Sequence, residues 1–403
     1  MKSTASVLTL ALFSGGILFA LVPIEQGLAQ SDPRVSKTVN SEAGGWDKEA
    51  AARYLDDRMD LWFQKAKKLG TGEGKTSCVS CHTAVPYALA RPLLRKAAGV
   101  SKPTAQELRL LEETVRRVDT YDSHEPLYKS KEKQSRGTEA VLNLLILAGE
   151  DARQNLKLPG EPTRKALDEL WKEQRSDGAW DWLDFGNEPY ESSDSVFYGA
   201  ALAAIAVGSV PENVGIAREN ASGHIARLRS YLIGSYAQQN LYNRIWLLLA
   251  SSRLKGLLTT GQQEAIIAES ERHQNADGGW SLQSLGPWTW SRTNAPFRPE
   301  GKPDASLLSN SDGFATGLIV YSLSQAGLTV GHPALKRSTD WLKANQRECQ
   351  IEQNRWQCWR TYSLNYDREH GGDEGEPWRR MFMSDAATAF ASLALLSQTE
   401  VLR

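Results

Sequence analysis

The chain has 403 residues and a formal net charge of −1 at pH 7, with 47 lysines and arginines against 48 aspartates and glutamates. This balance gives no basis for binding nucleic acid or an anionic membrane, so neither is expected as a partner. The length allows two domains of ordinary size or one large domain built from repeats.

The N-terminal segment has the pattern of a secretory signal. Lys2 precedes an apolar run over residues 7–22, and a small-x-small sequence at 27–29 ends the segment. These features predict a cleaved signal peptide over 1–29 and a flexible mature N-terminus over 30–45. An uncleaved anchor helix is the alternative, but the run is shorter than the roughly 20 residues that a membrane span needs. We therefore expect a periplasmic or otherwise exported protein with no transmembrane segment in the mature chain.

The first predicted helix lies within residues 48–70, where apolar residues recur at helical spacing: Leu55, Met59, Trp62 and Ala66. Within it, residues 56–60 read D-D-R-M-D and match the D-D-x-x-D pattern of ionising terpene synthases. So short a pattern arises by chance, and a solvent-exposed helix face is the expected explanation.

The next stretch, GTGEGKTSCVSCHTAVPY at residues 70–87, can be interpreted as a phosphate-binding loop, a zinc site or a haem attachment site. A phosphate-binding loop needs a glycine where Leu69 stands, and it should follow a strand, whereas a helix precedes it here. A structural zinc site needs four ligands, and Cys78, Cys81 and His82 supply at most three. A redox C-x-x-C would need a thioredoxin-like strand and helix, which the flanking sequence does not show.

The third interpretation is the c-type haem signature C-x-x-C-H at Cys78, Cys81 and His82. Two thiols at this spacing can form thioethers with the two vinyl groups of one porphyrin, and the adjacent histidine can ligate the iron. Haem c is attached outside the cytoplasm, which agrees with the predicted signal peptide. We therefore expect one covalent haem c, with His82 as the proximal iron ligand. Arg91 and Arg95 follow closely and are candidates to pair with the haem propionates.

The rest of the chain contains a degenerate repeat. A Q-x-x-x-G-x-W element occurs at 174–180 and again at 274–280, and Gln346 followed by Trp356 is a degenerate third copy. An apolar segment rich in Ala, Gly and Ser follows each copy and starts with a Ser-Asp pair, predicted as a helix N-cap with an acid in the first turn: Ser193-Asp194, Ser311-Asp312 and Ser384-Asp385.

About six such apolar helices are expected, at residues 84–94, 134–149, 192–208, 240–252, 310–327 and 383–398. Amphipathic segments such as 104–118, 161–174, 224–238 and 333–346 lie between them, and strand-type alternation is nearly absent. This order predicts an all-α fold, a single (α/α)6-type toroid of alternating outer and inner helices over residues 46–400. Long loops should gather at one end, including a haem-attachment loop at 70–90.

The Q-x-x-x-G-x-W elements resemble the QW motifs of the squalene–hopene cyclase and prenyltransferase group of α/α toroids, over most of the chain from residue 46 to 396. The resemblance implies a structural role for Gln174 with Trp180 and for Gln274 with Trp280: the glutamine caps a neighbouring helix end and the tryptophan packs against it. The D-x-D-D acid of the protonating cyclases has no match here. Fold alone does not confer function.

The remaining two cysteines, Cys349 and Cys358, lie in a polar segment. In an exported protein they are expected to form a disulfide that closes a short loop.

The predicted ring places the haem at the loop-rich mouth, next to the loops that carry the candidate distal ligands His124, Met381 and Met383. His370 lies in the same last loop, and an open or water-bound sixth position is a further alternative. The predicted function is that of an exported monohaem c-type cytochrome-like protein with an unknown redox partner and an electron-transfer or redox role at the barrel mouth. An isoprenoid or other apolar ligand would occupy the cavity. The alternatives are a squalene or terpenoid cyclase-like enzyme and an apolar-ligand-binding toroid without haem, so the sequence leaves open whether the protein is an enzyme.

Overall fold

The computed structural model describes residues 45–70, 74–211, 215–288, 305–351, 353–365 and 377–399. The chain divides into two units, residues 1–40 and 41–403, and all described residues belong to the second. The predicted signal peptide (1–29) lies outside the described residues. So does nearly all of the predicted flexible N-terminus (30–45).

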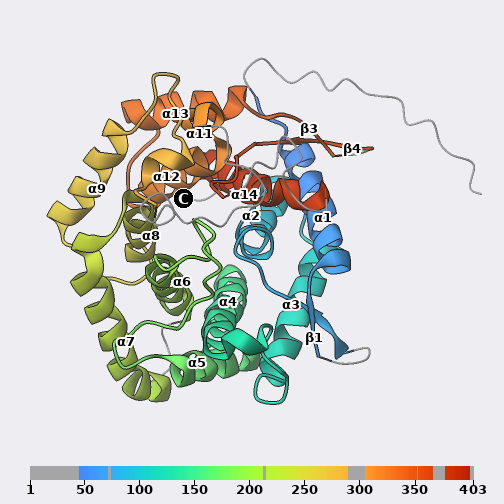
Figure 1. Cartoon of the computed structure of the whole chain (residues 1–403), viewed down its shortest axis with the longest axis vertical. Coiled ribbons are helices and arrows are strands. Elements are labelled where there is room, and N and C mark those ends of the chain that lie inside the picture. Colours follow the sequence, from blue (N-terminus) through green and yellow to red (C-terminus); the bar gives the residue numbers. More distant parts are fainter. Residues whose placement is uncertain are drawn as a thin grey trace, which may run out of the picture. The chain divides into compact units, whose positions relative to one another are not determined.

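The described part is an all-α toroid, as predicted (Figure 1). Six buried helices form the inner ring: α2 (Ala84–Ala97), α4 (Glu132–Arg153), α6 (Ser195–Ser209), α8 (Leu241–Ser251), α12 (Gly313–Gln325) and α14 (Phe382–Ser397). Each contacts the next in this order, and α14 contacts α2, so the ring closes. All six segments predicted as inner helices are found here.

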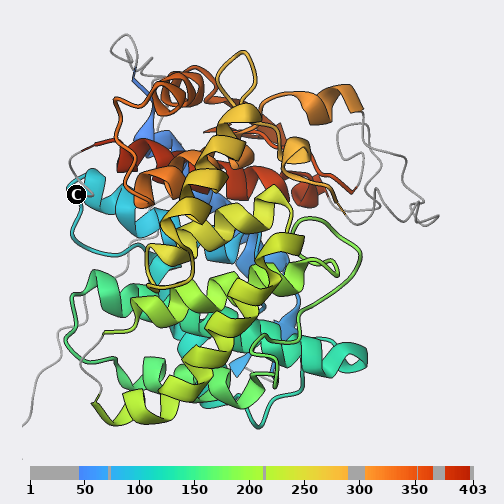
Figure 2. The ribbon, with the colours of Figure 1, turned by 90° about the vertical axis from the view of Figure 1, so that its left-hand side faces the viewer.

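Six outer helices surround this ring: α1 (Lys48–Lys65), α3 (Ala105–Asp119), α5 (Glu161–Glu173), α7 (Gly215–Ser235), α9 (Thr260–Arg272) and α13 (Pro333–Ala344). Each packs on at least one inner helix. In the side view of Figure 2, the green α4 and α6 lie toward one end of the long axis and the orange and red α12 and α14 toward the other. No helix of the described part has the length and apolar character needed to cross a membrane.

Short elements occupy the connections. They are the strands β1 (Lys68–Leu69), β2 (Thr76–Ser77), β3 (Arg347–Ile351) and β4 (Asn354–Cys358), the short helix α11 (Ala305–Ser309), and the 3-10 turns η2 (Lys129–Lys131), η3 (Tyr236–Gln238), η4 (Leu282–Leu285) and η5 (Pro377–Met381). The β3–β4 pair is antiparallel, and a disulfide joins Cys349 to Cys358 across it. The sequence predicted this disulfide and the short loop that it closes, and the loop is a β-hairpin.

The repeat tryptophans donate hydrogen bonds from the buried interior to the outer helices. The indole N–H of Trp180 donates to the Leu170 carbonyl at 2.8 Å, and that of Trp280 donates to the Ser270 carbonyl at 2.7 Å. Both tryptophans are fully buried. Each acceptor lies four residues before the repeat glutamine, so the indole N–H bonds to the last turn of the preceding outer helix.

The repeat glutamines join each outer helix to the next one. Nε2 of Gln174, at the end of α5, donates to the His224 carbonyl of α7 at 3.0 Å. Gln274, at the end of α9, likewise donates to the Ala334 carbonyl of α13 at 3.0 Å. These contacts agree with the structural role that the resemblance implied.

The third repeat copy corrects one sequence assignment. Its tryptophan is Trp359, whose indole donates to the Leu342 carbonyl at 2.8 Å, four residues before Gln346. Trp356, which the sequence favoured, instead donates to Asp57. Gln346 accepts from the Asp47 backbone N–H at 2.7 Å and donates to its carbonyl at 2.8 Å, which links α13 to the start of α1.

The Ser-Asp pairs do not share one role. Asp312 caps α12 as predicted, because its Oδ1 accepts from the Phe314 and Ala315 backbone N–H groups. Asp194 is at the N-cap of α6 without a side-chain cap bond. At the third pair the predicted cap position is wrong, because α14 begins at Phe382 with Met381 at its N-cap, but Asp385 is an acid of the first turn as predicted and is 1% exposed.

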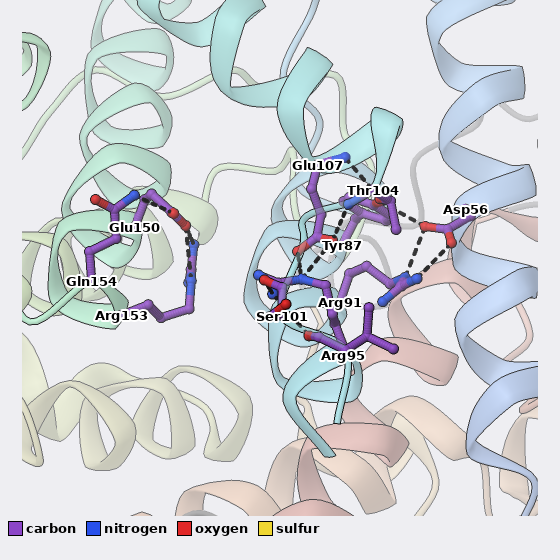
Figure 3. Close-up of polar contacts among 11 residues, drawn as sticks. Asp56, Tyr87, Arg91, Arg95, Ser101, Thr104, Glu107, Glu150, Arg153 and Gln154 are labelled. Atoms are coloured by element: carbon purple, nitrogen blue, oxygen red, sulfur yellow. Dashed lines mark hydrogen bonds and ion pairs between the residues drawn. The ribbon is translucent and has the colours of Figure 1, made fainter. Parts of the chain in front are cut away.

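The acidic residues at 56–60 of α1 bond to side chains of neighbouring elements. Asp56 accepts from both Nε and Nη2 of Arg91 at 2.9 Å and from the Tyr87 hydroxyl at 2.8 Å, which ties α1 to α2 (Figure 3). Asp57 accepts from Trp356, and Asp60 accepts from Gln106 of α3. The expectation of a simple solvent-exposed face was therefore incomplete.

Aromatic rings from the inner helices pack on one another inside the ring. The ring centroids of Tyr198 and Trp246 are 5.0 Å apart, and Phe390 lies 5.5 Å from both Trp246 and Phe314. All four residues are at most 1% exposed. At these positions protein side chains pack between α6, α8, α12 and α14.

Candidate functional site

A cavity of about 500 Å³ opens where several segments that precede inner helices meet the end of α1. Its lining comes from residues 62–67, 78–82, 127–128, 183–191 and 378–382, with Thr138 of α4. We call it the mouth pocket. Its volume lies in the range of small-molecule and cofactor sites, about 300–1,000 Å³.

Cys78, Cys81 and His82 all line the mouth pocket. The indole N–H of Trp62 donates to the Cys78 carbonyl at 2.7 Å, and the Cys78 N–H donates to the Lys67 carbonyl at 3.0 Å. These bonds hold the C-x-x-C-H segment against the end of α1, so the structure brings its three predicted site residues together in one wall.

Both thiols are poor nucleophiles at neutral pH. Burial raises the pKa of the Cys78 thiol to about 12, and burial likewise raises the pKa of Cys81 well above its ordinary value. A thiolate is the reactive and metal-binding form of cysteine. In this structure both cysteines are therefore held as neutral thiols at neutral pH.

Two groups of aromatic rings line the pocket. Trp62, Trp378 and Phe382 form the first, with centroid distances of 4.9 Å between Trp378 and Phe382 and 5.8 Å from Trp62 to either ring. Tyr128 and Phe185 form the second and meet edge to face at 4.9 Å. Flat apolar faces of this kind suit a ligand that contains rings.

Charged groups stand among these rings. Lys65, Lys67 and Arg379 line the pocket, and Nζ of Lys67 lies 4.1 Å from the Tyr128 ring centroid. Glu191 is the single carboxyl group among the described lining residues. Burial raises the pKa of Glu191 to about 7, against the opposing effect of a hydrogen bond with Asn187. Its carboxyl group can therefore be protonated or ionised near neutral pH.

The other predicted site residues lie elsewhere. His124 is not among the described lining residues; its Nε2 lies 3.1 Å from a carboxylate oxygen of buried Glu139, which also pairs with Arg117 at 2.9 Å. Met381 is 1% exposed, and Met383 packs against the core, also outside the pocket lining. His370 is outside the described residues.

The two arginines proposed for haem propionates also have other partners. Arg91 forms the ion pair with Asp56, and Arg95 donates from Nε to Glu107 at 3.1 Å and from Nη1 to the Ser101 carbonyl at 2.7 Å (Figure 3). Neither lines the mouth pocket. The cations that do line it are Lys65 at the end of α1, Lys67 just after it, and Arg379 on η5.

Sequence reasoning missed Glu191 and the aromatic rings. Glu191 lies in one of the long loops expected at the barrel mouth, residues 181–193, but nothing in the local pattern distinguishes this carboxylate from other surface acids. Its place in the pocket depends on contacts between segments distant in the chain, such as the bond from the Glu188 N–H to Oδ1 of Asn365 at 2.9 Å.

Among the residues that the structure describes, no group of three or more His, Cys, Asp and Glu side chains is arranged to hold a metal ion.

No protein-family model and no curated protein sequence matches the chain. Solved structures with a similar arrangement of helices include the unsaturated glucuronyl hydrolase from Bacillus sp. GL1, responsible for glycosaminoglycan degradation. It is 11% identical over 85% of this chain and 96% of its own, with a TM-score of 0.49. A second is UGL with dGlcA-Glc-Rha-Glc, 12% identical over 84% of this chain and 95% of its own, also with a TM-score of 0.49.

These similar structures are glucuronyl hydrolases, and neither is a cytochrome or a terpenoid cyclase. The toroid part of the predicted resemblance is confirmed. The predicted function is wrong: the comparison supports neither the electron-transferring haem cytochrome nor the terpenoid cyclase-like and apolar-ligand alternatives.

Proposed function

We propose that the protein binds a ring compound bearing carboxylate groups in the mouth pocket. The observation that carries this proposal is that one pocket combines five aromatic rings, three cationic side chains and one carboxyl group among its described lining residues. The rings match the flat faces of such a ligand, and the cations match its carboxylates through charge-assisted hydrogen bonds.

Binding is favoured over hydrolysis as the role of this pocket. Most glycoside hydrolases place two carboxyl groups on either side of the bond that they cleave. The described lining supplies Glu191 alone. With a pKa of about 7, Glu191 can donate a hydrogen bond to a ligand carboxylate when protonated and repels it when ionised.

The first test measures affinity for matched pairs of ligands. The pairs are a short oligouronate with a neutral oligosaccharide of equal length, and protoporphyrin with its dimethyl ester. The acid of at least one pair should bind at least about tenfold more tightly than its neutral counterpart, because two or three charge-assisted bonds contribute about 1.5–3 kcal/mol each. Equal binding of acid and neutral partner in both pairs, or no binding in either, would overturn the proposal.

Variants locate the site. Replacing Lys65, Lys67 and Arg379 together by Met should remove most of the preference for the acid, whereas Lys172→Met serves as the control. Lys172 is an exposed lysine that pairs with Asp122 on the outer surface. Unchanged selectivity in the triple variant would place the binding elsewhere.

Covalent attachment of haem c as a cofactor at Cys78, Cys81 and His82 stays a prediction. The three residues lie in one wall of a pocket of suitable volume, which is compatible with a tetrapyrrole as the carboxylated ring compound. Two ligands are possible, a tetrapyrrole and an acidic saccharide. The protein is exported from a host that attaches haem c, and its intact mass distinguishes them. An added haem mass identifies the tetrapyrrole. An unmodified mass together with selective oligouronate binding identifies the acidic saccharide.

Binding should also weaken as pH rises. The raised pKa of Glu191, about 7, means that it is mostly neutral at pH 6 and mostly ionised at pH 8, where it repels a ligand carboxylate. Affinity should therefore fall by about tenfold over this range, which corresponds to roughly one pKa unit of coupling. Titration calorimetry at both pH values measures this, and Glu191→Gln should flatten the dependence. A dependence of equal size in Glu191→Gln would assign it to another group.

A further inference from the structure

Two aromatic rings and two lysines form a continuous array at the edge of the mouth pocket. Nζ of Lys67 lies 4.1 Å from the Tyr128 ring centroid, and the Tyr128 and Phe185 rings meet edge to face with centroids 4.9 Å apart. Nζ of Lys131 lies 5.3 Å from the Phe185 ring centroid. We call these four residues the entrance array. The first three line the pocket and Lys131 does not, so the array extends beyond the pocket wall.

Phe185 exposes more of its surface than the tryptophans of the same pocket. It is 38% exposed, whereas Trp62 and Trp378 are 5% and 7% exposed. A single exposed apolar side chain is common on a protein surface and by itself indicates nothing. This ring, however, lies in a pocket wall and next to a second ring. Its uncovered surface is therefore available to a ligand that fills the pocket and extends out of it.

Backbone hydrogen bonds hold both rings of the array in place. The Phe185 N–H donates to the Glu191 carbonyl at 2.8 Å, and the Glu191 N–H donates to the Asn187 carbonyl at 2.8 Å. The Tyr128 N–H donates to Ser135 Oγ at 3.1 Å, near the start of α4. The two rings are thus positioned by the fold before any ligand arrives, which reduces the entropy lost on binding.

Both lysines of the array keep an ammonium group that can donate to an anion. Among the described residues neither pairs with a carboxylate, and each lies within the roughly 6 Å range of a cation–π contact. Such a contact leaves N–H donors for a ligand. Lys131 is also at the N-cap of α4, where its side chain makes no cap bond and its charge opposes the helix macrodipole. Helix stability therefore gives no reason for a cation at this position.

We propose that the entrance array is a second subsite of the mouth pocket, which packs an outer ring of the ligand against Phe185 and pairs a carboxylate of that ring with Lys131. This proposal rests on the proposed function, because it extends the same preference for carboxylated rings outward from the pocket. The outer ring is the next residue of an acidic saccharide chain or a propionate-bearing ring at the edge of a tetrapyrrole. Lys67 and Lys131 flank the two rings and supply the positive charge for either carboxylate.

Lys131→Met tests the subsite, with Lys129→Met as the matched control. Both lysines are on η2, but Lys129 is exposed and pairs with Glu125 at 2.7 Å. Affinities are measured for a uronate tetrasaccharide and its disaccharide, and for protoporphyrin and its dimethyl ester. Lys131→Met should reduce the preference for the tetrasaccharide, or for the free porphyrin acid, by about threefold, the modest effect of a partly exposed charge pair. Lys129→Met should leave both preferences unchanged, and Lys131→Arg should retain them.

Phe185→Leu tests the contribution of the ring. Leucine keeps an apolar side chain but removes the flat face and the contact with Lys131, whereas Phe185→Tyr keeps both. The leucine variant should fold, because the side chain that it replaces is 38% exposed, and its circular dichroism spectrum checks this. We expect Phe185→Leu to reduce the same preference by about threefold and Phe185→Tyr to retain it.

The outcomes distinguish failure of the subsite from failure of the proposed function. If the wild type prefers acids to their neutral counterparts but Lys131→Met or Phe185→Leu binds with unchanged preference, the subsite fails and the proposed function stands. An equal loss in Lys129→Met assigns the effect to general charge and also overturns the subsite. If the wild type has no preference for acids, both fail. A loss confined to the saccharide pair identifies the chain as the occupant, and one confined to the porphyrin pair identifies the tetrapyrrole.

Discussion

Asp385→Ala is expected to lower the free energy of unfolding by about 3–5 kcal/mol, because it leaves the buried Arg58 guanidinium without its counter-charge. Both side chains are at most 2% exposed in the ion pair. The change also removes the acceptor for Tyr54 and Thr83. Chemical denaturation followed by circular dichroism measures the loss.

Two comparisons sharpen this experiment. Asp119→Ala breaks the exposed pair with Lys165, in which both side chains are nearly half exposed, and should lower the free energy of unfolding far less. Arg58→Met combined with Asp385→Leu should recover much of the loss, since no buried charge then lacks a partner. A cost for Asp385→Ala no larger than that for Asp119→Ala would contradict the prediction.

Trp280→Ala is expected to cost about 3–5 kcal/mol, because the indole is fully buried and its removal leaves a cavity beneath an outer helix. The change also breaks the bond to the Ser270 carbonyl, which holds the last turn of α9. Trp280→Phe keeps most of the ring but loses this bond, so it should cost less, about 1–3 kcal/mol. The same denaturation experiment measures both variants.

Trp341→Ala is the matched control. Trp341 is a half-buried tryptophan of α13 whose indole bonds to Asp277 at 2.9 Å near the surface. Its truncation should cost much less than that of Trp280, since less apolar surface returns to water. If Trp280→Ala and Trp341→Ala are equally stable, the repeat tryptophan does not stabilise the toroid more than a half-buried one.

The architecture could be predicted from the sequence because each helix carries its own signal. The inner helices are apolar on all sides, whereas the outer ones are amphipathic, so the alternation of layers is visible residue by residue. The repeat tryptophans Trp180 and Trp280 mark the same turn of successive outer helices, and their bonding is nearly identical. In the third copy the β3–β4 hairpin intervenes before Trp359, and local spacing alone therefore selected Trp356.

The pocket was predictable only in part. Cys78, Cys81 and His82 are neighbours in the chain, so one short motif places them together whatever the fold. Glu191, Arg379 and the two groups of rings come from four separate segments of the chain, at 62–67, 127–128, 183–191 and 378–382, and no local pattern assigns them to one wall. His124 shows the opposite case: it appeared available in sequence, but Glu139 on α4 engages it.

The sequence by itself determined the helical class, the two alternating layers and the position of the C-x-x-C-H motif before an inner helix, because periodicity and short motifs are properties of local chain. The tertiary structure alone decided which charges and rings share the mouth pocket, which aspartate caps a helix and which is buried against Arg58. Those outcomes depend on ring closure, which brings α14 against α1 and α2 and so sets the burial and partners of residues that look alike in the linear chain.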